Sequence, residues 1–290
     1  MKLKYTTKLF IIVNLIVTAF RTVQVLILTE AGTGFLKSNA LGWNIAGMVF
    51  SVLALAALFF NSVRAVRQPE TINLKGAPSM VMLAAVGIMY ACGAAFSLIE
   101  KQIGYKIEIL LLLLAAFSAF IILISALCRL QLPKICALSF IAYWLVKFAL
   151  AYLHYTEKPL RVRTVYETLA ICFVILFSVA FGKAFSGVKS ERNFRLLYPF
   201  GLIASSLCIV SVIPEFIAFI TGQGDKITES AVSPIVLVAA AVFTGFVTIN
   251  TFKKSNTIHP KQKLRAQAKA QADLGTEVEI GVTNDENTNM

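Results

Sequence analysis

The sequence predicts an all-α integral membrane protein with eight transmembrane helices, arranged as two parallel four-helix repeats. Composition is the first of three observations behind this prediction. Hydrophobic residues make up 58% of the 290 residues and charged residues 14%, with a mean hydropathy of +0.77. A soluble domain has roughly 45–50% apolar and about 25% charged residues. A chain this apolar cannot cover its surface with polar groups in water, so the bilayer must be its solvent.

The second observation is a series of apolar runs separated by short charged connections. A helix needs about 20 apolar residues to cross ~30 Å of hydrocarbon. Eight runs of this kind are present: Leu9–Thr29, Leu41–Val63, Pro78–Leu98, Ile107–Cys128, Ile135–Tyr155, Thr164–Gly187, Leu196–Thr221 and Ser233–Phe252.

The first run has two interpretations, because Lys2, Lys4 and Lys8 precede it as they would precede a signal peptide. Arg21 and Gln24 interrupt the region where cleavage would occur, and no small-residue cleavage site follows. We therefore interpret the run as an uncleaved transmembrane helix.

The net charge of +12 indicates how the helices are oriented. Cytoplasmic loops collect Lys and Arg. When the N-terminus is placed in the cytoplasm, most of the 27 lysines and arginines fall on the cytoplasmic side. The sequence therefore predicts a multi-pass protein of the cell membrane with both termini cytoplasmic.

One outer loop, Thr156–Arg163, departs from this charge rule. It carries Lys158, Arg161 and Arg163 against a single Glu157. These side chains either extend to the outer headgroups or form a mouth that attracts anions.

The third observation is a sparse internal repeat. A shift of about 121 to 127 positions superposes the second half of the chain on the first. It places Lys147 of the fifth span on Arg21 of the first span, and Pro199 on Pro78. The predicted units are 1–130 and 131–254, each with four spans, followed by a polar cytoplasmic tail, 255–290, that is largely disordered. Parallel repeats of this kind occur in transporters, with the substrate site at the repeat interface.

Ionisable side chains inside spans are costly and mark functional sites by default. We single out four of them as candidates: Arg21, Lys147, Glu167 and Glu215. Two helical stripes accompany the cations. They consist of Asn14, Thr18, Arg21 and Gln24 in the first span, and of Tyr143, Lys147 and His154 in the fifth. Because a cation facing hydrocarbon would cost too much, both stripes are expected to face the bundle interior.

The helix rise places Arg21 and Lys147 about 12 residues, or ~18 Å, from the inner end of their spans. We therefore predict that these two cations form a central substrate site, with hydrogen bonds from Asn14, Thr18, Gln24 and Tyr143. The outer approach, or a proton-coupling path, would consist of Glu167, Glu215 and His154. The alternative is two structural salt bridges, in which each cation pairs with one of the glutamates.

Pro214 precedes Glu215 and removes a backbone donor, which tends to free the carbonyl of Val210. The resulting bend would line a cavity or gate, or it would be a packing kink with Glu215 close to the outer headgroups.

Several functional classes lack their sequence signatures. There is no metalloprotease, nucleotide-binding or hydrolase motif, no cluster of metal ligands and no basic face with aromatic residues for nucleic acid. We expect no enzyme activity, metal or cofactor. The predicted function is a transporter or permease for a small polar solute, anionic or zwitterionic. The alternative is a non-transporting membrane subunit, such as a sensor, assembly or partner-binding protein. Association with a second copy or with a partner membrane protein stays open.

Overall fold

Six α-helices and one short 3-10 helix are bounded within the part of the chain that the computed structural model describes. They are α1 (Lys2–Ile27), α2 (Leu41–Ala65), α5 (Lys134–Thr156), α6 (Val162–Phe185), α7 (Glu191–Ile220), η2 (Gly224–Lys226) and α8 (Pro234–Ser255). The described residues are 2–30, 33–35, 37, 40–65, 85–89, 91–93, 95, 110, 113–114, 117, 134–156, 162–185, 191–226 and 234–255.

The prediction of an α-helical membrane protein is confirmed by these helices. Five of them (α1, α2, α6, α7 and α8) are long and apolar enough to cross a membrane, and α5 contains a shorter apolar stretch, Leu138–Leu153. The third and fourth predicted spans, Pro78–Leu98 and Ile107–Cys128, lie largely outside the described residues, although the few described positions within them are helical. The predicted tail, 255–290, lies outside them beyond Ser255.

The seventh helix begins earlier than the apolar pattern predicts. The predicted span starts at Leu196, with Pro199 near its first turn, whereas α7 begins at Glu191 and contains both Pro199 and Pro214. A polar segment at the membrane boundary continues the helix without adding to the apolar run, so hydropathy alone does not detect it. Each proline leaves one backbone carbonyl of α7 without its helical donor.

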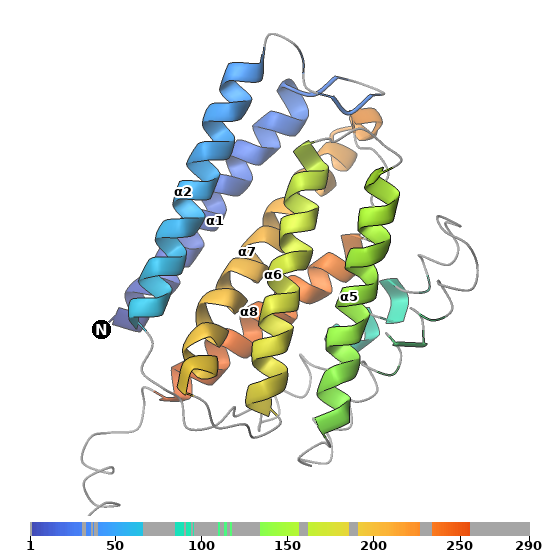
Figure 1. Ribbon diagram of the computed structural model, residues 1–290. Helices are drawn as coiled ribbons and strands as arrows, with labels where there is room; N and C mark the ends of the chain where they lie inside the picture. Colours follow the sequence, from blue (N-terminus) through green and yellow to red (C-terminus); the bar gives the residue numbers. More distant parts are fainter. Residues whose placement is uncertain are drawn as a thin grey trace, which may run out of the picture.

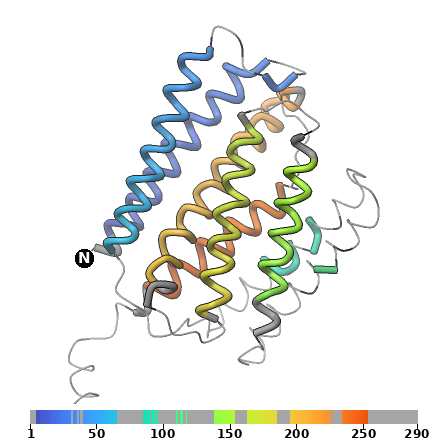
Figure 2. The backbone as a smooth tube through the Cα atoms, in the orientation of Figure 1, coloured from blue at the N-terminus to red at the C-terminus, as the bar shows by residue number. Residues whose placement is uncertain are grey.

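Helix α7 is the centre of the bundle. It packs against α1, α2, α6 and α8, while α5 packs against α6. Figure 1 shows α1 and α2 side by side, α6 and α5 beyond α7, and α8 crossing obliquely behind α7. The tube in Figure 2 follows the same path, with the ends of α1 and α7 meeting at one end of the bundle. The first helix of the chain therefore packs against one of the last.

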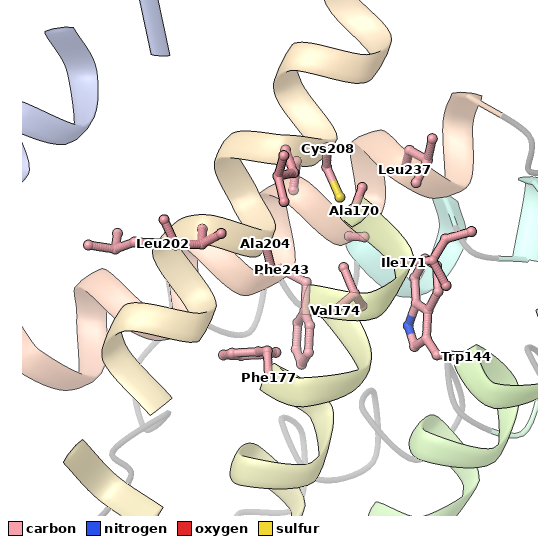
Figure 3. Close-up of a cluster of buried hydrophobic side chains, with 14 of the residues drawn as sticks. Trp144, Ala170, Ile171, Val174, Phe177, Leu202, Ala204, Cys208, Leu237 and Phe243 are labelled. Carbon is pink, nitrogen blue, oxygen red and sulfur yellow. The ribbon is translucent and has the colours of Figure 1, made fainter. Parts of the chain in front are cut away.

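Aromatic side chains fill the core between α5, α6 and α8. The ring of Phe243 on α8 lies 5.1 Å from Phe140 and 5.5 Å from Phe181, measured between ring centroids. Figure 3 shows Phe243 beside Phe177, with Trp144 farther along the same cluster. In a bilayer, such packing stabilises the fold mainly through van der Waals contact, because lipid tails are as apolar as the side chains themselves.

The end of α1 is capped by two lysines from outside the helix. Nζ of Lys226 donates to the carbonyl oxygen of Leu26 at 2.6 Å and to Oε1 of Gln223 at 2.8 Å. Nζ of Lys37 donates to the carbonyl oxygen of Ile27 at 2.9 Å. The last carbonyls of a helix lack intrahelical donors and carry partial negative charge, so a lysine is a favourable partner there. Lys226 thereby joins the outer end of α1 to the connection between α7 and α8.

The packing at Gly201 gives a test of the bundle. A methyl group at this position of α7 would overlap the hydroxyl of Thr248 on α8 and lie 3.0 Å from the ring of Phe177 on α6. We expect Gly201→Ala to lower the free energy of unfolding by about 1–3 kcal/mol, the usual cost of overpacking. Thermal or denaturant unfolding in detergent would measure this change.

The matched control is Gly42→Ala in α2, where an added methyl group meets nothing within 4 Å. Helix propensity predicts an unchanged or slightly higher stability for this variant. Equal effects of the two substitutions would contradict the packing described for α7.

Candidate functional site

The polar stripe of α1 is buried inside the protein. The side chains of Asn14, Thr18, Arg21 and Gln24 are all buried. Nδ2 of Asn14 donates to the hydroxyl of Ser206 on α7 at 3.1 Å, and also to the carbonyl oxygen of Phe10 at 2.8 Å. The stripe therefore faces α7 rather than the lipid.

Arg21 lies in the outer half of this stripe and is only 6% exposed. Nη1 donates a hydrogen bond to Oε1 of Gln24, one helical turn further along. On its other side, the guanidinium carbon lies 4.9 Å from the ring centroid of Tyr166 on α6. A cation over an aromatic face is stabilised by the ring quadrupole, most strongly where water is excluded. An amide oxygen and an aromatic ring thus hold the cation in place.

A second cation, Arg163, pairs with a carboxylate. Its Nη2 donates to Oε2 of Glu215 at 2.7 Å, and its Nε lies 2.7 Å from Oε1. Both side chains are 14% exposed. The pair links the first turn of α6 to α7. This contact assigns Arg163 to the interior of the bundle, which argues against both interpretations of it as an outer-loop charge.

The two arginines belong to one group of charges. Arg21 interacts electrostatically with Tyr166, Glu215 and Arg163, and Glu215 also interacts with Glu167. We call these five residues the outer charge cluster. They come from α1, α6 and α7, and the cluster contains two cations and two carboxylates. Its formal charge is therefore balanced.

Several polar atoms at and beside the cluster are buried without a hydrogen-bond partner among the described residues. Within the cluster they are the hydroxyl of Tyr166 and Nε and Nη1 of Arg163, and beside it Oγ1 of Thr18, Nε2 of Gln24 and Oγ of Ser211. Nε of Arg163 is among them although it lies 2.7 Å from Oε1 of Glu215. Leaving a buried polar atom unsatisfied costs about 1–3 kcal/mol. Such atoms need a reason to persist inside a membrane protein, and binding a polar ligand is one. Within the described ranges, no group of three or more His, Cys, Asp or Glu residues could hold a metal ion.

The residues predicted on the fifth span lie on α5. Lys147 and Tyr143 are buried there, and Tyr143 packs edge-on against Trp144 with ring centroids 5.4 Å apart. His154 belongs to the same helix, but its side chain lies outside the described residues. Since α5 packs against α6 whereas α1 packs against α2 and α7, the direct opposition of Arg21 and Lys147 stays a prediction.

Two members of the cluster, Arg163 and Tyr166, were not predicted as site residues. Arg163 precedes Tyr166 by three residues and Glu167 by four, so it shares a helical face with each of them. That spacing was a usable signal, because it places a cation beside a carboxylate that was already a candidate. The contact of Arg163 with α7 had no comparable signal in the sequence.

The Arg163–Glu215 pair can be tested by a double-mutant cycle. Arg163→Met strands a buried carboxylate, so we expect a loss of about 3–5 kcal/mol in unfolding free energy. The double variant Arg163→Met/Glu215→Met should lose much less than the sum of the two single variants, because both charges are then absent. Unfolding in detergent measures all four corners of the cycle. Additive losses would show that the two side chains do not interact.

Comparison of the chain with models of protein families, with curated proteins and with solved structures found no match. The function is therefore inferred from the buried residues themselves.

Proposed function

We propose that this protein is a multi-pass transporter of the cell membrane for a small polar solute. The observation that carries the proposal is the outer charge cluster, together with the unpartnered polar atoms beside it. Charges inside transmembrane helices are expensive and most often line substrate or ion pathways. The balanced charge of the cluster favours a zwitterionic solute over a purely anionic one, since a zwitterion presents one group to each sign of charge.

A second candidate function is supported by one specific contact. The Arg163–Glu215 pair is bidentate, a geometry that holds two helices in a defined orientation. If every charge in the cluster has this role, the protein is a non-transporting membrane subunit that senses, assembles or binds a partner. Arg21 separates the two candidates, because its guanidinium contacts an amide oxygen and an aromatic ring rather than a carboxylate.

The proposed architecture has eight spans in two parallel repeats, with the site between the repeats and both termini cytoplasmic. The helices α1, α2, α5, α6, α7 and α8 agree with six of these spans, while the number of eight, the repeat and the orientation rest on the sequence pattern alone. In this arrangement, Lys147 is the repeat counterpart of Arg21 and the second candidate ligand group. We expect neither catalysis nor a bound metal.

The topology can be tested with reporters fused after Met290. A reporter that is active only in the cytoplasm should be active, and one that requires export should be inactive, because the positive-inside bias places the C-terminus inside. The opposite pattern would contradict the proposed orientation. An even number of spans that starts from a cytoplasmic N-terminus cannot place the C-terminus outside.

Transport can be tested with purified protein reconstituted into liposomes and a panel of labelled zwitterions, anions and cations of similar size. We expect uptake of at least one zwitterion. Arg21→Met and Lys147→Met should each fold and insert but lose most of this uptake, since methionine preserves length and packing while removing the charge. Rates relative to wild type, with stability measured in parallel, check this expectation.

The matched control is Lys183→Met, which removes a lysine from an exposed position near the end of α6 and should keep normal uptake. Destabilisation of Arg21→Met and Lys147→Met by about 3–5 kcal/mol, the cost of breaking a buried pair, would favour the subunit function. Normal stability and normal uptake in both variants would leave the proposed site without support.

A further inference from the structure

We infer that Arg21, Gln24 and Tyr166 form a binding subsite for a carboxylate group. The inference rests on the proposed transport function and names the chemistry that the solute must carry at one end. It follows from three buried side chains, two of which contact the third. Gln24 and Tyr166 both contact the guanidinium of Arg21, and each has a polar atom that can donate a hydrogen bond and has no partner among the described residues.

Gln24 contributes an amide donor whose orientation is determined by its neighbour. Arginine donates hydrogen bonds and accepts none, so the amide atom facing Nη1 of Arg21 must be the oxygen. Nε2 of Gln24 is consequently left as a donor, and it has no hydrogen-bond partner among the described residues. The side chain is 0% exposed, so water at the protein surface does not satisfy it.

Tyr166 contributes a hydroxyl on the ring that lies against the guanidinium. The ring face of Tyr166 is covered by Arg21, and the residue is 4% exposed. Its hydroxyl has no hydrogen-bond partner in the described part of the chain. A phenolic hydroxyl is a good donor to an anion, and here it lies beside a cation that would hold such an anion.

Arg21 itself lacks a carboxylate partner. Among the described residues, no carboxylate oxygen lies within 4.0 Å of its guanidinium nitrogens, whereas Arg163 is engaged by Glu215. A guanidinium has five N–H donors in a planar fork, and the described contacts of Arg21 use one nitrogen. A ligand carboxylate can accept bonds on both oxygens and fits this fork bidentately. A neutral carbonyl group could accept a hydrogen bond here but would leave the positive charge without a counter-charge, and a cationic ligand would be repelled.

The subsite can be tested by ligand-induced stabilisation of the purified full-length protein in detergent. The probes are acetate, propionate and L-alanine, each compared with its own amide at equal concentration and ionic strength. Each amide matches the shape of its carboxylate and lacks the negative charge. A ligand that binds only the folded state stabilises it by RT ln(1 + [L]/Kd) and so raises the unfolding temperature as its concentration increases. We expect at least one carboxylate to raise it and the matching amide to leave it unchanged.

Two conservative variants locate the binding. Tyr166→Phe removes a hydroxyl that has no partner described, so the stability of the unliganded protein should not fall. Gln24→Met removes Nε2 together with the amide oxygen that accepts from Arg21, so its unliganded protein should be less stable and its affinity is measured below its own unfolding temperature. Each should weaken the apparent affinity for the carboxylate about tenfold or more, as expected when a hydrogen bond to a charged group is lost. Tyr198→Phe is the control. The side chain of Tyr198 forms a hydrogen bond with Thr7 and its ring packs against Phe252, and neither residue belongs to the outer charge cluster. It should keep the wild-type affinity.

The inference is overturned if no carboxylate stabilises the protein more than its amide, or if Tyr166→Phe and Gln24→Met bind as tightly as wild type. Failure of the transport proposal is distinguishable from this result. Carboxylate binding at these residues without uptake of any solute would retain the subsite and reject transport. Uptake of a solute that has no carboxylate, without carboxylate binding, would retain transport and reject the subsite.

Discussion

A guanidinium held inside the bilayer is the constraint on which the arrangement of α1, α6 and α7 depends. On an isolated helix, Arg21 would cost several kcal/mol to bury, so α1 can only lie where other helices supply the compensation. Tyr166 supplies a ring face, Gln24 an amide oxygen, and Glu215 a nearby negative charge. These partners restrict the rotation of α1 about its axis more strongly than apolar packing does, because apolar faces can exchange lipid for protein at little cost.

The two arginines of the cluster have different surroundings, although the sequence alone does not distinguish them. Arg163 is matched by Glu215 in a bidentate contact, so its main effect is to join α6 to α7. Arg21, in contrast, directly contacts an amide oxygen and an aromatic ring, and neither carries a negative charge. Nε2 of Gln24 and the hydroxyl of Tyr166 have no hydrogen-bond partner among the described residues. A structural ion pair beside an unmatched cation is consistent with a site that keeps its shape while a charged group enters and leaves.

The positions of the described spans could be predicted from the sequence, although α1 and α7 begin earlier than predicted, whereas the contacts between spans could not be predicted. Apolar run length predicted helices such as α2 and α8 to within a few residues, because lipid permits little else. The periodicity of α1 likewise predicted that Arg21 is buried. Which side chain meets Arg21 depends on how α6 and α7 neighbour α1, and helical periodicity carries no information about neighbours. For this reason Tyr166 and Arg163 were missed, and the opposition of Arg21 and Lys147 that the weak repeat suggests stays a prediction.

The contact of α1 with α7 has a consequence for biogenesis. Helix α1 is made well before α7, and α7 and the Lys226 that caps Leu26 follow roughly 170 to 200 residues later. At about 5–20 residues per second, Arg21 must wait on the order of ten seconds or more before Tyr166 and Glu215 exist. During that interval α1 either stays in a wet insertion channel or crosses with its arginine drawn toward an interface. The contacts around Arg21 therefore form in a docking step that comes well after α1 has been made.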